Sequence, residues 1–459
     1  MKERPLGRKR KDLLEGPVGR TLLELAGPMV IGVASVILFN IVDTFFVSRL
    51  GAPELAAMSF TFPVTFLVVS FSMGMGVGLT VAASRGIGQG DREQVRKLIT
   101  HGLLLANLSV VVIALLGLFT VGPVFRALGA PEELLGRIRE YMLPWYLGVG
   151  FLIVPMMGNS AIRATGDTKT PSLIMLFASA INLVLDPLLI FGIGPFPRLE
   201  LMGAALASVI SWAVTFFASL WVLGWRDRLL ELSRPRWQEM RASWRRIFKV
   251  GLPATANNIV LPLAIGVLTR LVAGQGTEAV AAFGVGGRID AVALIGLGAM
   301  VTAVSPFVGQ NVGAGKFDRV REALLFCIKA SLIYGAATAG LLMLAAGPLA
   351  SLFATEVGVI EAIVQYLFTV PISYGPFCIA ILVGAIFNAL NQPLKATFLI
   401  AFRLFVLAVP LAALGASLAG TPGLFGGIAT ANALAGVLGL WMMRRIRRDP
   451  EAALKGPEE

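Results

Sequence analysis

Two aspartates lie within strongly apolar stretches of this 459-residue sequence. Asp43 follows Asn40 by three residues, and Asp186 follows Asn182 by four residues. Residues three or four positions apart share one face of a helix. The spacing therefore predicts two helices that each carry a carboxylate and an amide on a polar face.

A carboxylate among apolar residues is costly unless it holds a proton or a cation, or meets a hydrogen-bond donor. Asp43 and Asp186 could each serve an ion path, or could each merely bond a neighbouring helix. If the two meet, burial and repulsion couple their titrations. We favour the functional interpretation, which predicts a site for a proton or a sodium ion.

The surrounding composition predicts the elements that hold these residues. Hydrophobic residues make up 56% of the chain and charged residues 14%, against about 25% charged in soluble domains. Apolar blocks of roughly 20 residues, the length that crosses a bilayer as a helix, recur along the whole sequence. We expect an all-α polytopic membrane protein with twelve transmembrane helices. The predicted spans are 28–47, 60–82, 98–120, 142–162, 171–193, 202–224, 252–272, 280–308, 323–346, 364–387, 396–418 and 425–443.

The basic residues predict the orientation of the chain. Of its 39 Lys and Arg, 30 fall in the leader, the even-numbered loops and the tail, and five fall in the odd-numbered loops. Positive residues near membrane ends stay on the cytoplasmic side. We therefore expect both termini in the cytoplasm and a multi-pass protein in the inner membrane of a prokaryote. The net charge of +12 then requires no nucleic-acid partner.

An internal duplication is visible at a shift of 225 residues. It pairs Pro28 with Pro253, and it pairs the loop 85–96 with the loop 310–321. Each half has six predicted spans, so both halves enter from the same side as parallel repeats, with a central cleft between them. The expected parts are a basic cytoplasmic leader (1–27), a six-helix lobe (28–224), a cytoplasmic linker (225–250), a second six-helix lobe (251–443) and a cytoplasmic tail (444–459).

Several kinds of chemistry find no support in the sequence. It has no phosphate-binding loop of the Gly-x-x-x-x-Gly-Lys-Ser/Thr type, so ion gradients remain as the energy source. Cys327 and Cys378 lie in separate apolar spans without the spacing of a metal site, and His101 is interpreted as an interfacial residue. The run Gly74–Gly78 lies within a span and indicates close helix packing. We expect no enzyme, no cofactor, and no metal beyond sodium at the coupling site.

The second half carries other charges in its spans. Arg270, Arg288 and Arg403 accompany Asp290 there. Pairing between helices is the favoured interpretation, and contact of Asp290 with a cationic substrate is the alternative.

Four stretches carry a resemblance that covers nearly the whole chain. They are Asn40–Asp43, Asn159–Asp167, Asn182–Pro187 and Ser305–Gly315. Together with the six-plus-six duplication, they resemble the multidrug and toxic compound extrusion (MATE) transporters, and within that family the DinF-like and archaeal branch. The fold that this implies is the MATE/MOP type with two lobes.

The resemblance also implies roles for single residues. It places the cation site at Asp43, Asn182, Asp186 and Ser208, with Asn159 as a polar residue nearby. It makes Pro28 the point where the first helix bends, whereas a proline also suits the first turn of a helix. The candidates for substrate contact or coupling are Asn40, Asn159, Pro28 and Asp290.

The sequence thus predicts a monomeric secondary antiporter. It would export amphipathic, often cationic organic compounds in exchange for H⁺ or Na⁺ by alternating access. The alternative is a flippase for a lipid-linked oligosaccharide or another lipid precursor, whose phosphate would suit Arg270, Arg288 and Arg403.

Overall fold

The structure is a computed structural model that describes residues 12–231 and 233–448. Helices make up nearly all of this part of the chain, and it contains no β-strand. The outer portions of the predicted leader (1–11) and tail (449–459) lie outside the described residues. The predicted all-α class is confirmed.

The chain divides into two compact units. The first unit contains Gly27–Thr255, and the second contains Leu13–Ala26 together with the chain from Ala256 onward. Helices α1 (Val18–Ser48) and α7 (Trp237–Ala273) each contribute residues to both units.

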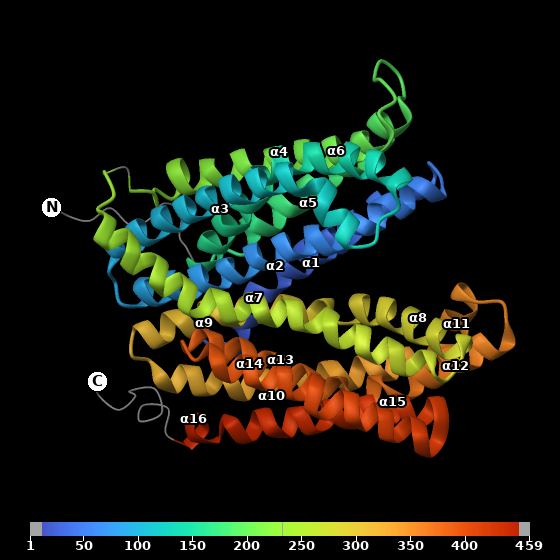
Figure 1. Cartoon of the computed structure of the whole chain (residues 1–459). Helices are drawn as coiled ribbons and strands as arrows, with labels where there is room; N and C mark the ends of the chain where they lie inside the picture. Colours follow the sequence, from blue (N-terminus) through green and yellow to red (C-terminus); the bar gives the residue numbers. More distant parts are fainter. Residues whose placement is uncertain (1–11, 232, 449–459) are drawn as a thin grey trace. The chain divides into compact units, whose positions relative to one another are not determined.

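The first unit is built around α4, which packs against its four neighbours α2, α3, α5 and α6. Figure 1 shows these helices running alongside one another. Phe125, Ile138, Trp145 and Met157 are almost fully buried in its core. The helices are α2 (Ala52–Gly88), α3 (Arg92–Ala127), α4 (Glu132–Ala164), α5 (Lys169–Phe191), α6 (Glu200–Trp221) and the π-helix η1 (Val222–Arg226).

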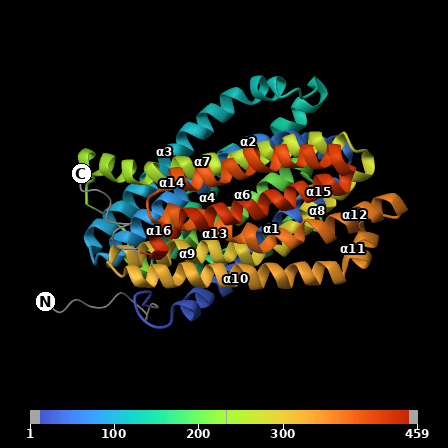
Figure 2. The same ribbon diagram turned by 90° about the horizontal axis from the view of Figure 1, so that it is seen from below.

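The second unit is built around α13, which packs against α9, α10 and α15. Figure 2 shows α9, α10 and α13 side by side. Its elements are α8 (Thr277–Ala293), α9 (Ile295–Gly313), α10 (Phe317–Leu344), α11 (Ala346–Phe353), α12 (Val357–Thr369), the 3₁₀-helix η2 (Pro371–Ser373), α13 (Tyr374–Ala389), α14 (Pro393–Ala401), the π-helix η3 (Phe402–Ala408), α15 (Val409–Met442) and α16 (Arg444–Arg448).

Eleven helical stretches in the described part are long and apolar enough to cross a membrane. One of them, Pro393–Met442, has 50 residues and covers the last two predicted spans. Ala419 and Gly420 leave helical geometry within it, and Gly420 adopts a left-handed φ of 62°. This break separates the eleventh span from the twelfth, so the expected number of twelve agrees with the structure.

Part of the predicted leader (1–27) is helical. Helix α1 begins at Val18, ten residues before the proposed first span, and Leu13–Ala26 belongs to the second unit. Val18, Leu22 and Leu25 are 0–2% exposed, at the spacing of one helical stripe, while Arg20 and Glu24 form an exposed ion pair of 2.8 Å. A hydropathy window averages these two faces and therefore misses an amphipathic beginning.

Part of the predicted linker (225–250) is helical as well. Helix α7 already begins at Trp237, and the first unit extends to Thr255. The basic residues here are compatible with a helix because they lie on its solvent side, while Ile247 and Val250 are buried.

Glycines bring α2 and the first half of α7 into backbone contact. A Cβ atom added at Gly78 would lie 2.3 Å from the carbonyl oxygen of Ile247, and one at Gly74 would lie 2.6 Å from the amide nitrogen of Thr255. Within a membrane, helices associate largely through van der Waals packing, and small residues allow their backbones to approach closely. The packing role predicted for the run Gly74–Gly78 is confirmed.

We predict that Gly78→Val destabilises the first unit by about 1–3 kcal/mol, since the side chain would meet backbone that cannot move independently. The matched control is Gly136→Val on α4, where an added Cβ has no neighbour within 4 Å. Thermal unfolding of the two purified variants in detergent measures the difference. Equal midpoints would contradict the close packing of α2 on α7.

Candidate cation site

Asp186 and Asn182 form a completely buried pair on α5. Each is 0% exposed, and the Asn182 side-chain amide donates a hydrogen bond of 3.0 Å to Asp186 Oδ1. The four-residue spacing therefore places them on one face, as predicted. Pro187 follows directly and has no N–H to donate to the carbonyl of Leu183, which leaves another acceptor in the same turn.

Asp43 is brought to the same region from α1. It is 5% exposed. The Asp43 carboxylate acts electrostatically on Asp186, and both carboxylates act on the Tyr141 hydroxyl of α4. Asp43 and Asp186, which are 143 positions apart in the sequence, thus share one polar region of the first unit with Tyr141.

Three oxygen atoms in this region are buried without a donor. Asp43 Oδ1, Asp186 Oδ2 and Asn182 Oδ1 have no hydrogen-bond partner among the described residues. Buried polar atoms are almost always satisfied, because an unpaired one costs about 1–3 kcal/mol. Carboxylate and amide oxygens are the ligands of hard cations, and a proton shared at a carboxylate would also relieve the cost. The oxygen set fits either H⁺ or Na⁺.

Packing between α1 and α5 positions the two acids. The Ser179 hydroxyl donates to the carbonyl of Ser35 at 3.0 Å, and a Cβ at Gly32 would lie 3.2 Å from the Cα of Ser172. The two helices are therefore in direct contact at both of these places.

Three further residues were predicted at or near the cation site, Ser208 and Asn159 from the resemblance and Asn40 from its spacing to Asp43, and they differ in burial. Ser208 is buried on α6, which packs against α5. Asn159 is buried on α4 and accepts a hydrogen bond of 2.9 Å from Ser219. Asn40 is exposed, and its amide donates to the carbonyl of Val36 rather than towards Asp43.

Pro28 lies well inside α1. The helix begins at Val18, so the first-turn interpretation of this proline is wrong. Pro28 stands one residue after the point where α1 passes from the residues of the second unit to those of the first.

Tyr141 was missed as a functional candidate, although the sequence held a signal for it. The shift of 225 residues pairs Tyr141 with Tyr366. In the second unit Tyr366 donates a hydrogen bond of 2.7 Å to Asp290, and Tyr374 donates to the other carboxylate oxygen. Asp290 is therefore paired between helices, as the favoured interpretation held, but with phenols rather than with arginine.

The three arginines of the second half differ in their surroundings. Arg270 and Arg288 are exposed, whereas Arg403 is 7% exposed within the π-helix η3. Arg403 donates to Asn432 at 3.0 Å and lies 4.9 Å from the ring centroid of Phe377. Its Nε atom has no partner among the residues that the structure describes.

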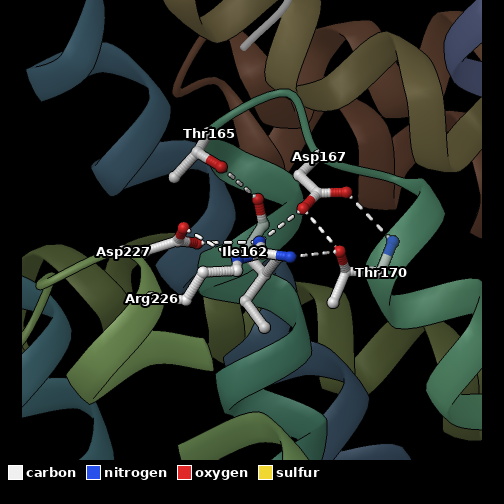
Figure 3. Close-up of polar contacts among 6 residues, drawn as sticks. All are labelled: Ile162, Thr165, Asp167, Thr170, Arg226 and Asp227. Atoms are coloured by element: carbon white, nitrogen blue, oxygen red, sulfur yellow. Dashed lines mark hydrogen bonds and ion pairs between the residues drawn. The ribbon is translucent and has the colours of Figure 1, made fainter. Parts of the chain in front are cut away.

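A second polar cluster joins the ends of α4, α5 and η1 in the first unit (Figure 3). The Arg226 guanidinium donates to Asp167 at 2.6 Å, to the Thr170 hydroxyl at 2.7 Å and to Asp227. Asp167 also accepts from the amide and the hydroxyl of Thr170. This loop ends the predicted stretch Asn159–Asp167, and its acid fixes the turn between two membrane helices.

Residues 12–231 and 233–448 contain no cluster of side chains typical of a protein metal centre. No group of three or more His, Cys, Asp or Glu side chains there could hold a metal ion. The chemistry that the described site supports is reversible binding of a small cation.

The buried carboxylates and the succession of membrane-length helices define an integral membrane protein of the transporter class. The MatE family model matches residues 28–188 and 253–414, once in each half and with the starting points 225 residues apart. The chain therefore belongs to the MATE family of transporters, and it is not an enzyme. The predicted resemblance to this family is confirmed.

Relatives extend over nearly the full length of the chain. A FAD transporter of Shewanella oneidensis is 40% identical over 437 residues, which cover 95% of this chain and 97% of the relative. The probable multidrug resistance protein YoeA of Bacillus subtilis is 28% identical over 366 residues, 79% of each chain. Among solved structures, the Vibrio cholerae MATE transporter VcmN in the bent form has a TM-score of 0.90 at 30% identity, covering 95% of this chain and 98% of that one.

We predict that Asp167→Asn loosens the turn between α4 and α5 by about 1–3 kcal/mol, because it removes one of the two carboxylates that accept from Arg226, the one in this turn. Hydrogen–deuterium exchange of residues 162–172 measures the effect. The exposed acid Asp91, whose side chain accepts only from Gln94 in the described structure, supplies the control variant Asp91→Asn.

The same bonds set a pH dependence. Burial alone raises the pKa of Asp167, but the bonds from Thr170 and Arg226 outweigh it and hold the pKa below its usual range. The stabilisation is therefore present above the ordinary carboxyl pKa and is lost as the pH falls through the lowered one, below about 4. The quantity compared is the protection factor of residues 162–172, which corrects for the pH dependence of exchange in an unstructured amide. A protection factor that stays constant as the pH falls below about 4 would contradict the role of the Asp167 carboxylate.

Proposed function

We propose that this chain is a secondary active exporter that exchanges a small organic compound for H⁺ or Na⁺ by alternating access. The observation that carries the proposal is the pair of buried acids, Asp43 and Asp186, which together with Asn182 have three buried oxygens without a donor among the described residues. Such acids within a membrane protein usually mark an ion path. Membership of the MATE family and the multidrug name of the Bacillus relative support an organic cargo.

Coupling in this proposal is a competition between two bound states. The inward-facing protein takes up cargo, and cations from outside bind at Asp43, Asn182 and Asp186 and favour the release of that cargo. Each ligand must weaken the equilibrium affinity for the other by the same factor. Ser208 would complete the oxygen set, and Tyr141 would donate its hydroxyl to whichever carboxylate is ionised.

The setting of this exporter is also part of the proposal. The excess of Lys and Arg in the even-numbered loops supports an inner-membrane protein with both termini in the cytoplasm. We further propose that it works as a monomer, since a single chain supplies both halves of the duplicated fold.

We predict that Asp43→Asn and Asp186→Asn each lower gradient-driven transport at least tenfold, because an amide can neither bind a proton nor neutralise a cation. Efflux of a fluorescent organic cation from proteoliposomes is measured under a proton gradient and, separately, under a sodium gradient. The control is Asp318→Asn, an exposed acid at the start of α10. The gradient that drives the wild type identifies the coupling ion, and full activity of both Asn variants would remove the site from the mechanism.

A flavin dinucleotide is a second candidate cargo. The Shewanella relative carries the name FAD transporter and is 40% identical over nearly the whole chain. Arg403 favours an anionic cargo, because it is a buried guanidinium with an unpartnered Nε and no carboxylate partner in the described residues. It lies in a π-helix, an element common at functional sites.

The two cargoes are separated by a single substitution. We predict that, if the chain exports FAD, Arg403→Gln lowers FAD transport by at least fivefold and leaves transport of an organic cation within a factor of two. Arg288→Gln, at an exposed arginine of α8, is the matched control. Equal loss for both cargoes would indicate damage to the fold, and transport of neither cargo by the wild type would favour the lipid-linked cargo.

A further inference from the structure

The end of α9, the start of α10 and the loop between them hold the chain that leads into α1. Three side chains of the second unit, Asn311, Lys316 and Arg319, donate to four consecutive main-chain carbonyls, those of residues 13–16. We call these three residues the lead-in clamp. Arg319 donates to Gly16 at 2.8 Å, to Glu15 at 3.1 Å and to Leu13 at 3.3 Å; Lys316 donates to Leu14 at 2.9 Å, and Asn311 to Leu13 at 3.1 Å.

The clamp is itself held in place. The Nε of Arg319 donates to Asn311 Oδ1 at 3.0 Å, and its guanidinium lies 5.6 Å from the ring centroid of Phe307. Asn311 is 0% exposed and also donates to the carbonyl of Phe307 at 2.8 Å. The five bonds given above all go to backbone carbonyls, so they fix the path of the chain whatever side chains it carries.

Apolar contacts continue the attachment into α1. Leu13 is 1% exposed, and Val18 and Leu22 are 0% exposed, all within the second unit. A Cβ atom at Gly19 would lie 2.7 Å from the ring of Phe326 on α10, so the first turn of α1 lies directly against that side chain.

The remainder of α1 belongs to the other unit. From Gly27 onward the helix is part of the first unit, where the carbonyl of Ser35 accepts from Ser179 and Asp43 is buried. The change of unit falls between Ala26 and Gly27, next to Pro28. Proline removes the helical bond to the carbonyl four residues earlier, so this is the point of least resistance to bending.

The first unit contains the corresponding arrangement for α7. At the start of α3, Arg96 donates twice to the carbonyl of Leu230, and Thr100 accepts from the amide of Glu231. Leu230 and Glu231 precede α7, which passes from the first unit to the second after Thr255. In both units, therefore, the third helix of a repeat holds the lead-in of a helix that continues in the other unit.

We propose that Asn311, Lys316 and Arg319 are positioning residues that keep the start of α1 permanently attached to the second unit, so that movement of the units bends α1 at Gly27–Pro28 and thereby alters the surroundings of Asp43. The proposal rests on the alternating-access function proposed above. The clamp would make α1 a mechanical link, since one end follows the second unit while the end with the acid follows the first. The duplicated loop 310–321, which contains all three clamp residues, thereby acquires a role.

The first experiment removes the clamp without touching the cation site. Arg319→Ala is compared with Arg321→Ala, an exposed arginine two residues further along the same helix. We expect Arg319→Ala to make amide exchange in residues 13–26 at least tenfold faster, to lower gradient-driven transport at least tenfold, and to leave equilibrium binding of a fluorescent organic cation within a factor of two. Unchanged transport in a variant with fast exchange would overturn the proposal.

The second experiment restores the attachment by another bond. Gly19→Cys and Phe326→Cys are introduced together with Arg319→Ala, in a chain whose buried Cys327 and Cys378 are replaced by alanine. A Cβ at Gly19 lies 3.6 Å from Cγ of Phe326, which brings the two sulfurs within reach of a disulfide. We expect oxidation to restore transport and reduction to abolish it again.

The outcomes separate the clamp from the proposed function. If oxidation of the same cysteine pair in the presence of Arg319 stops transport, the lead-in must detach during the cycle and the permanent clamp is wrong. Amide exchange reports the clamp without any cargo. A wild type that shows slow exchange in residues 13–26 but no gradient-driven transport would therefore contradict the proposed function and leave the attachment itself established.

Discussion

The cost of placing a carboxylate out of water governs the first unit of this protein. Asp186 is completely buried, and Asn182 is its one hydrogen-bond donor among the residues that the structure describes, while Asp43 adds a second buried carboxylate that acts on it electrostatically. A structure built only for stability would pair these acids or replace them with apolar residues. The surrounding helices instead hold them together by close packing, with Ser179 bonded to the backbone of α1 and Gly32 against α5.

The second unit also contains a carboxylate inside the helical bundle, but both of its oxygens accept hydrogen bonds. Asp290 accepts from two tyrosines, one of which occupies the repeat position of Tyr141. The duplicated framework therefore keeps a tyrosine beside an acid in each unit but supplies the acid from different helices. The two units are alike in packing and different in electrostatics, and this difference is where a transporter can divide ion binding from cargo binding.

Helices α1 and α7 each contribute residues to both units, and in each case side chains of one unit bond the chain that precedes the helix. An arginine in each unit donates hydrogen bonds to backbone carbonyls that precede a long helix. Glycines on α2 allow the backbone of α7 to come into direct contact with it. Bonds to main-chain atoms do not report the sequence they hold, which is why the lead-in could not be recognised from its own residues. The hydropathy of 18–27 and of 237–250 also concealed these helices, because charged and apolar residues alternate along them.

The sequence by itself determined the membrane class, the duplication and the helices that carry Asp43 and Asp186, because hydropathy, repetition and helical spacing are local properties. It also identified the MATE family through four short stretches, Asn40–Asp43, Asn159–Asp167, Asn182–Pro187 and Ser305–Gly315. Only the tertiary structure decided that α1 and α7 each serve two units, that Tyr141 accompanies the acids, that Asn40 turns away from them, and that residues 311–319 hold the start of α1. The bonds to the start of the chain before α1, for example, join residues 298 to 306 positions apart, and no local pattern in the sequence encodes such contacts.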